Sequence, residues 1–281
     1  MESYKVLFVC SEIHPYLPES AISNVCKMLP PAIQDKGFEI RTFMPKFGGV
    51  NERRNQLHEV IRLSGLNLVI NESDHPLIIK VASISSARMQ IYFIDNDDYF
   101  QRKTMYHDEK GVFFNDNDER TIFFARGVLE TVRKLRWSPD IVHCHGWFTF
   151  PTAFYMRKAF KDDPLYADSK IILSFYDEAF DDEFSDDFKK KALTDGVRMR
   201  DLDLMMNHNY TDLMKLCINY ADGIALASPE VSREFVDYAE NTGKFVLEHK
   251  AEGLLSDDYA EFYNNILAKR RRKKKTQKET E

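Results

Sequence analysis

The chain has 281 residues, of which 43% are hydrophobic, and its formal net charge is −6; this length allows one large domain or two small ones with a full core. The first residues, MESYKVLFV, lack a basic start followed by a long apolar stretch, and no later run approaches the roughly 20 apolar residues of a membrane span. We therefore expect a soluble, cytoplasmic protein that is neither exported nor bound to a membrane.

The four cysteines are isolated in the sequence, and none has the CxxC spacing of a zinc or redox site. They are Cys10, Cys26, Cys144 and Cys217. We expect buried free thiols and no metal cofactor, which fits a reducing compartment.

The N-terminal elements form a βαβ pattern. Residues 4–10 are a short apolar run typical of a buried strand, and residues 22–36 have helical periodicity that ends at Gly37. Residues 39–44 form a second apolar run closed by Pro45. A strand, a helix and a second strand in this order predict two parallel strands joined by a crossover helix.

From residue 57 to residue 95 the pattern changes to short β-branched or alternating runs. Polar turns separate them, and the runs read HEVIRLSGLNLVI, PLIIKVASI and RMQIYFID. Such spacing predicts hairpins inserted into the main sheet or flanking it.

The alternation of helices and strands resumes after residue 117. The predicted elements are a helix at 118–136, a strand at 140–145, a helix at 149–160 and a strand at 170–175. Two helices should follow before the strand GIALAS, and a last helix should begin with Ser228 as N-cap and Pro229 at its first position. The whole pattern predicts an α/β fold with a doubly wound, Rossmann-like sheet and inserted β-hairpins.

Two segments carry most of the uneven charge. Residues 177–187, DEAFDDEFSDD, are dense in carboxylates but lack the alternation and the glycine of a calcium loop, so we interpret them as an exposed loop. Lys269 to Lys275 form an unbroken basic run, which is either a solvated disordered tail or a weak contact site for RNA or another polyanion. We place one domain at 1–250, a C-terminal helix at 251–268 and the basic tail at 269–281.

Ligands of doubly wound sheets bind beyond the carboxyl ends of the strands, so function is to be sought in the residues that follow each strand. In this chain four segments qualify. They are 11–20, 143–148, 174–178 and 227–229.

Several motifs, in the same order along the chain, resemble those of the bacterial glycogen and plant starch synthases. The opening KVLFVCSEIHPYLPESAISNV is similar to the family's first strand and KTGGL loop, and LPPAIQDKGFEIRTFMPKFG resembles its LPKAL…GHEVRVLLPRYG. NDNDERTIFFARGVLE, PDIVHCHGWFT and INYADGIALASPEVSREF resemble DNxERFxFFxRAALE, PDIVHAHDWHT and ADxVTTVSPTYAREI. The resemblance extends from about Lys5 to about Val236.

This resemblance implies the GT-B fold, in which two Rossmann-like domains face each other across a cleft. Family members transfer glucose from ADP-glucose to the non-reducing end of an α-1,4-glucan with retention of configuration. The resemblance covers the N-terminal domain only, whereas the second domain of the family carries the arginine, lysine and glutamate that hold the nucleotide diphosphate.

The loop after the first strand departs from the family at each position of its glycine-rich motif. The family's lysine falls on Pro18, its threonine on Glu19, and its two glycines on Ser20 and Ala21. Proline supplies neither a cation nor an N–H, and a glutamate repels a diphosphate by roughly 1 to 4 kcal/mol at about 4 Å. We therefore expect this loop to bind ADP-glucose poorly.

Two further strand ends also lack polar side chains that the family uses. The family's HDWH aspartate and second histidine fall on Gly146 and Phe148, and its TIHN histidine and asparagine fall on Tyr176 and Asp177. A weak carbohydrate surface is still compatible with Tyr176, because its ring can stack and its hydroxyl can form a hydrogen bond.

Four other candidate residues have a structural reading beside a functional one. Trp147 either stacks on a sugar at the cleft mouth or packs under the following helix, and Glu12 either caps the neighbouring helix or accepts a sugar hydroxyl. We expect His143 and His145 to face opposite sides of their strand and to bond to backbone, which argues against a shared zinc ion.

These readings favour a family member reduced to the N-terminal domain that does not act as an independent transferase. Its expected partner is an α-glucan or a separate protein carrying the second GT-B domain, which would cover an apolar face around Trp147 and Phe148. The alternatives are an active synthase subunit that takes ADP-glucose once completed by such a protein, and a repurposed scaffold with a polyanion-binding tail.

Overall fold

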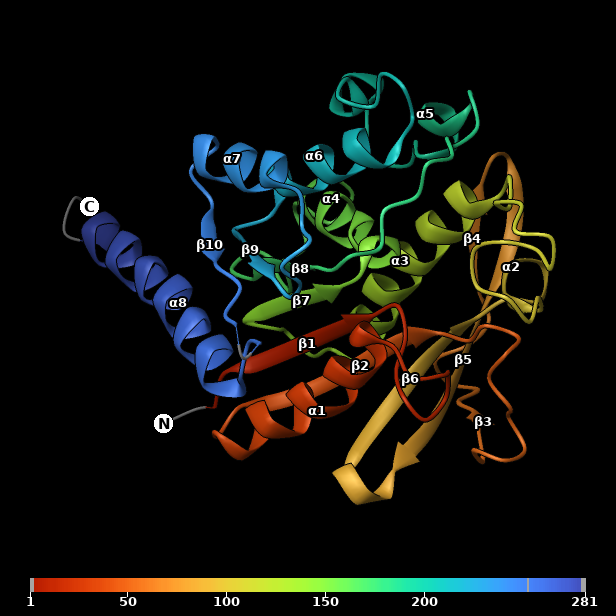
Figure 1. Cartoon of the computed structure of the whole chain (residues 1–281), viewed down its shortest axis with the longest axis horizontal. Helices are drawn as coiled ribbons and strands as arrows, with labels where there is room; N and C mark the ends of the chain where they lie inside the picture. The colour runs from red at the N-terminus through yellow and green to blue at the C-terminus, as the bar shows by residue number, and fades with distance from the viewer. Residues whose placement is uncertain (1–2, 252, 279–281) are drawn as a thin grey trace.

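The computed structural model describes residues 3–251 and 253–278, and of residues 269–278 it describes only the helical backbone. One sheet forms the centre of the molecule, with strand order β10-β9-β8-β7-β1-β2-β6-β5-β3 and β4 paired to β5 (Figure 1). The strands are β1 (Lys5–Cys10), β2 (Glu39–Pro45), β3 (His58–Glu59), β4 (Leu66–Ile70), β5 (Ser73–Ile84), β6 (Met89–Asp95), β7 (Ile141–His145), β8 (Lys170–Phe175), β9 (Gly223–Leu226) and β10 (Phe245–Leu247).

The strands β10-β9-β8-β7-β1-β2-β6, written in their order across the sheet, all run parallel. In strand β1, for example, Val6 lies opposite Ile40 of β2 on one side and Ile141 of β7 on the other. Strand β5 then pairs antiparallel with β6, β4 and β3. The predicted hairpins are therefore confirmed, and they flank the main sheet, which β6 joins as a strand parallel to β2.

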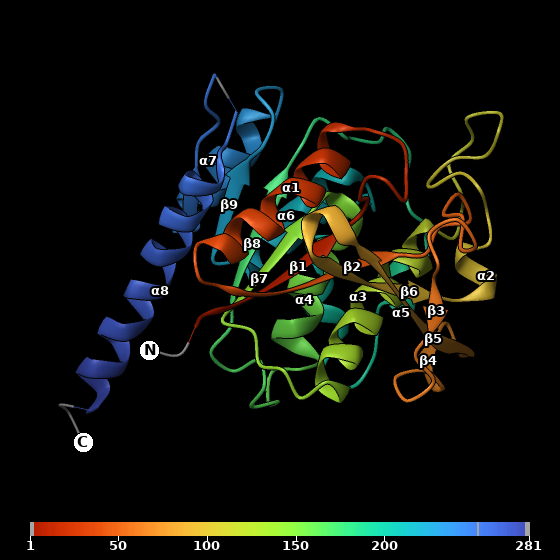
Figure 2. The same cartoon turned by 90° about the horizontal axis from the view of Figure 1, so that it is seen from below.

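Helices cover both faces of the sheet, which confirms the doubly wound α/β prediction (Figures 1 and 2). Helices α3, α4, α6 and α7 contact one another in series on one face, and α1 and α8 contact each other on the opposite face. The helices are α1 (Ala21–Asp35), α2 (Asp97–Phe100), α3 (Asn117–Lys134), α4 (Pro151–Lys158), α5 (Phe188–Lys191), α6 (Tyr210–Tyr220), α7 (Arg233–Asn241) and α8 (Ser256–Lys278).

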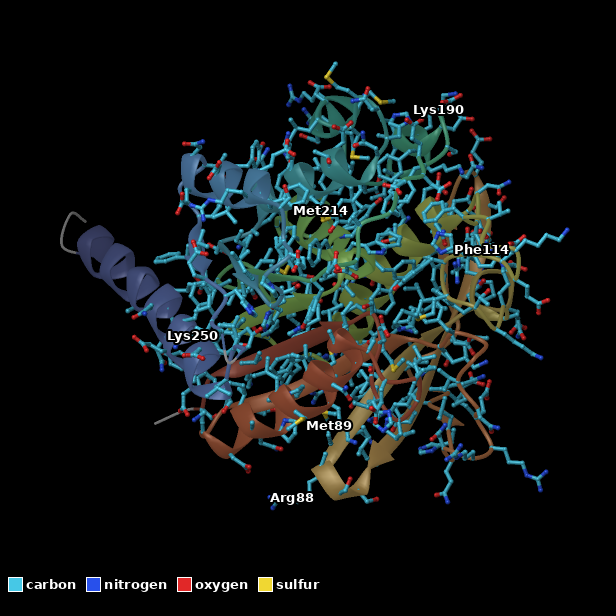
Figure 3. All side chains as sticks on the ribbon, in the orientation of Figure 1. Arg88, Met89, Phe114, Lys190, Met214 and Lys250 are labelled. Carbon is cyan, nitrogen blue, oxygen red and sulfur yellow. The ribbon has the colours of Figure 1, made fainter. Side chains whose placement is uncertain are left out.

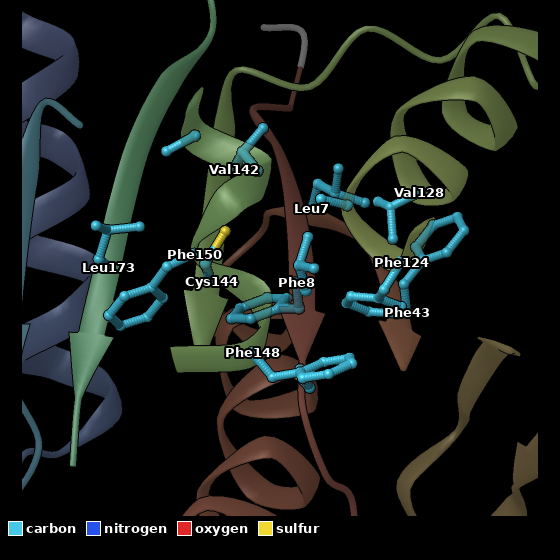
Figure 4. Close-up of a cluster of buried hydrophobic side chains, with 14 of the residues drawn as sticks. Leu7, Phe8, Phe43, Phe124, Val128, Val142, Cys144, Phe148, Phe150 and Leu173 are labelled. Carbon is cyan, nitrogen blue, oxygen red and sulfur yellow. The ribbon is translucent and has the colours of Figure 1, made fainter. Parts of the chain in front are cut away.

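The core lies between the sheet and these two layers, where β-branched and aromatic side chains from neighbouring strands meet apolar faces of the helices. Figure 4 shows part of it around β1 and β7, with Leu7, Phe8, Phe43, Phe124, Val128, Val142, Cys144, Phe148, Phe150 and Leu173 labelled. All four cysteines are free and buried in this core, as predicted.

The start of the last predicted helix and the number of full helices between β8 and β9 differ from the prediction. Helix α7 begins after Ser232, whose hydroxyl accepts a hydrogen bond from the Glu234 N–H at 3.3 Å, and not after Ser228. The Ser228 hydroxyl instead accepts from the Glu230 N–H at 3.2 Å, which closes a local turn ahead of the helix. Between β8 and β9 only α6 is a full helix, because α5 has four residues.

The C-terminal helix α8 packs its apolar side on the domain, with Tyr259, Phe262, Tyr263 and Ile266 buried. It continues to Lys278, where the sequence predicted a disordered tail from residue 269. The side chains of the basic run Lys269 to Lys275 lie outside the described residues, so its predicted contact with polyanions stays a prediction.

None of the described helices combines the length and the apolar character of a bilayer-spanning helix. The same described part of the chain holds no cluster of three or more His, Cys, Asp or Glu side chains placed to bind a metal ion.

Candidate functional site

The strand-end segments that the sequence singled out meet at one edge of the sheet. Strands β1, β7, β8 and β9 are neighbours and parallel, so their carboxyl ends lie side by side. Two long loops, which contain Phe114 and Lys190, lie at the end of the molecule toward which β1 points (Figures 1 and 3). The candidate site is therefore the edge formed by residues 11–20, 145–148, 175–180 and 226–230.

The loop after β1 is closed by its own side chains. Ser20 is the N-cap of α1, and its hydroxyl accepts from the Ser23 N–H at 2.9 Å, while the Ser23 hydroxyl accepts from the Ser20 N–H at 2.8 Å. The Ser20 hydroxyl also donates to Glu12 Oε2 at 2.9 Å. Glu12 thus holds the N-cap residue in place, whereas the structural reading of the sequence had it cap the helix directly.

Pro18 and Glu19 lie on the outer side of this loop and are exposed. The Glu19 carboxylate is 71% exposed and lies 3.9 Å from His14 Nε2. A negative charge is therefore presented to solvent just ahead of the N-terminus of α1, where an anionic ligand would need positive potential.

His143 and His145 share one face of the sheet, so the expectation that they face opposite sides is wrong. Side chains two positions apart along a strand point the same way, and the two rings lie 3.9 Å apart. His143 bonds Tyr263 through Nδ1 at 2.6 Å and Ser174 through Nε2 at 2.7 Å, and His145 Nδ1 bonds the Tyr176 hydroxyl at 2.8 Å. Side chains, and not backbone groups, are the partners.

Burial lowers the pKa of both histidines. It takes the pKa of His145 to about 3 and that of His143 well below its usual range, where the neighbouring His145 contributes as well. Both rings are therefore neutral near pH 7, and neither can supply the positive charge that an anionic ligand requires.

Tyr176 lies at the end of β8 and is buried, with its hydroxyl bonded to His145. Its role in this structure is to orient that ring. Stacking of Tyr176 on a sugar would require the surrounding loops to move.

Gly146 adopts φ +85°, a backbone conformation that favours glycine. A Cβ at this position would overlap the Ser11 hydroxyl and would lie 3.1 Å from Glu178 Oε2. The structure thus gives a packing reason for the glycine, because a larger side chain, such as the aspartate that the family resemblance implies at this position, has no room here.

Trp147 and Phe148 are 2% and 0% exposed, so they do not form an apolar face open to a partner. The Trp147 ring lies 4.9 Å from Tyr106 and 4.8 Å from Phe180 between ring centroids. Its neighbours come from two loops that fold over the strand ends, and not from the following helix. The chain itself therefore already covers Trp147 and Phe148, the two side chains that were predicted to lie in the face for a second domain.

Glu178 is the site residue that the sequence reasoning missed. Its Oε1 accepts from the Trp147 N–H at 2.7 Å, and burial raises the pKa of its carboxyl well above the usual range, with a further contribution from Glu12. It belongs to the acidic run that we interpreted as an exposed loop, in which Phe180 and Phe184 also point inward. The four-residue spacing of Phe180, Phe184 and Phe188 was the signal that one side of this run is buried.

Comparisons with known proteins agree on one family. A family model described as starch synthase catalytic domain matches residues 5–254. Glycogen synthase of Chlorobium luteolum is 36% identical over 175 residues, which are 62% of this chain and 36% of that protein. Glycogen synthase of Chlorobium phaeovibrioides is 30% identical over 241 residues, 85% of this chain and 48% of that protein.

Among solved structures, the catalytic domain of starch synthase IV from Arabidopsis thaliana, bound to ADP and acarbose, aligns with a TM-score of 0.69 at 17% identity. The alignment covers 88% of this chain and 51% of that one, and it shows that this chain has the fold of about half of that GT-B glycosyltransferase. The chain spans about half, or less, of the length of these relatives.

Proposed function

Because this chain belongs to the family of starch synthase catalytic domains, we propose that it binds an α-glucan at the edge of its sheet and does not by itself transfer glucose from ADP-glucose. It is then a non-catalytic, glucan-binding relative of the glycogen synthases. The relatives' names support the glucan, as does the acarbose in the starch synthase IV structure.

The observation that carries the proposal is the charge of the candidate site. Residues 11–20, 145–148, 175–180 and 226–230 contain five carboxylates and no lysine or arginine. Nucleotide diphosphates are bound through cations and free N–H groups at helix N-termini, whereas here Glu19 is exposed and the Ser23 N–H is bonded to Ser20. A sugar carries hydroxyl groups and no charge, so neutral side chains and carboxyl groups can bind it.

Affinity electrophoresis in native gels containing glycogen tests the glucan half of this proposal. We expect the full chain to migrate more slowly as the glycogen concentration rises, and soluble maltoheptaose to restore its mobility. A variant lacking residues 269–281 is the matched control, because it removes the basic run and leaves the candidate site intact.

The truncated variant should be retarded to the same extent as the full chain. Mobility that does not respond to glycogen would contradict the proposal. Retardation that disappears with the truncation would place the contact in the basic run and contradict it as well.

A further inference from the structure

The candidate site contains buried polar atoms with unused hydrogen-bonding capacity. His145 Nε2 is buried and has no hydrogen-bond partner among the described residues, and the buried Ser11 Oγ interacts among them only with the hydroxyl of Tyr106. Buried polar groups in proteins are almost always paired with protein, ligand or water. Both atoms lie where β1 and β7 end, so they point to a small polar ligand group at this place.

Glu178 lies at the same edge of the sheet, in the loop that follows the neighbouring strand β8. Its Oε1 is fixed by the Trp147 N–H, while Oε2 forms no hydrogen bond within the described chain and lies 3.1 Å from where a Cβ of Gly146 would be. The carboxyl group of Glu178 therefore lies beside Gly146, the one residue of the 145–148 segment that has no side chain. Glu178 as a whole residue is partly exposed to solvent.

The surroundings make this carboxyl group suited to an uncharged ligand. Glu12 lies close enough to raise the pKa of Glu178 further, and the four strand-end segments contain no lysine or arginine to compensate a second anion. A carboxyl group that binds a proton more tightly than usual can both donate to a hydroxyl and accept from it.

We propose that Glu178 is the specificity-determining residue of the candidate site. It presents its free oxygen across Gly146 to a hydroxyl group of an uncharged ligand. This inference rests on the proposed binding of glucan and assigns it to a residue outside the motifs that identify the family.

The first test compares two isosteric variants with a neighbouring control. E178Q retains an acceptor for the Trp147 N–H and a polar end group, so maltotriose binding measured by calorimetry should stay within about threefold of the unmodified chain. E178L has a similar volume but no hydrogen bond, so its affinity should fall about three- to tenfold, the cost of one hydrogen bond. D181N changes an exposed carboxylate of the same loop that lies outside the candidate site, and it should leave the affinity unchanged.

A second measurement uses the unmodified chain, so it does not depend on whether E178L folds. Carboxyl groups are labelled with a carbodiimide and glycine ethyl ester, and the labelled residues are identified by mass spectrometry. Maltotriose should protect Glu178 and leave the labelling of the exposed Asp181, outside the candidate site, unchanged.

The outcomes separate the two proposals. If the chain binds maltotriose while Glu178 is unprotected and E178L binds as tightly as the unmodified chain, the assignment of Glu178 is wrong and the proposed function stands. If the unmodified chain binds neither maltotriose nor glycogen, the proposed function fails and the assignment fails with it.

Discussion

Replacing Trp147 by alanine should destabilise the fold by about 3–5 kcal/mol, the usual cost of removing a large buried aromatic side chain. Trp147 is 2% exposed, and its ring contacts Tyr106 and Phe180, which belong to two different loops. The substitution opens a cavity that the loops can close only by moving. Urea unfolding followed by far-UV circular dichroism measures the loss.

Val112→Ala is the matched control for this experiment, because Val112 lies in one of the same two loops but is 59% exposed. It should change the free energy of unfolding by less than about 0.5 kcal/mol. If Trp147→Ala lowers the free energy of unfolding by no more than this control does, the ring does not hold the loops over the strand ends. An accessible Trp147, as the sequence suggested, would then be the better explanation.

Gly146→Ala should destabilise the chain by more than the same substitution at Gly65. Gly65 has φ +84° and Gly146 has φ +85°, so both variants incur the conformational cost of a side chain there, about 1–2 kcal/mol. At Gly65 nothing lies within 4 Å of the added Cβ, whereas at Gly146 it meets the Ser11 hydroxyl and Glu178. Overpacking should add about 1–3 kcal/mol at Gly146 alone.

Thermal and urea unfolding of the two glycine variants, measured side by side, give this difference directly. A serine-to-glycine change at residue 11 in the Gly146→Ala background should recover part of it, because it removes the nearest obstacle. Equal losses at Gly146 and Gly65 would show that the space beside Gly146 is not filled. The glycine would then need another explanation than packing.

The sheet and its helices could be predicted because local patterns determine them. The run KVLFVC and the motif DIVHCH are apolar enough to be buried strands, and the structure pairs them as parallel neighbours. The order of strands across the sheet does not follow from such runs, and the predictions relied on general rules of α/β folds for it.

The candidate site was predicted less well, because its geometry depends on contacts between distant segments. Glu12 was singled out as a candidate cap of the helix and Ser20 as a candidate ligand-binding residue, but the bond between them depends on the shape of the loop. Glu178 was missed because a run of carboxylates is typical of an exposed loop, and nothing local shows that one member bonds the Trp147 N–H. The histidine error was avoidable, since alternation along a strand places His143 and His145 on one face.

The same contacts explain why the two loops could not be placed from the sequence. Phe113 and Phe180 lie 67 positions apart, yet their rings stack at 5.0 Å and help to bury Trp147. Such a cluster forms only after the sheet has brought the strand ends together, so periodicity within one segment cannot reveal it.

Calorimetric titration of the full chain with ADP-glucose tests the central claim most directly, with ADP and maltoheptaose titrated into the same preparation. The charge of the candidate site predicts no nucleotide binding tighter than a Kd of about 1 mM, while maltoheptaose gives measurable heat. A Kd for ADP-glucose of about 1 μM would contradict this account. Pro18 and Glu19 would then be compatible with a working donor site, and the chain would be better explained as an active synthase subunit completed by a second domain.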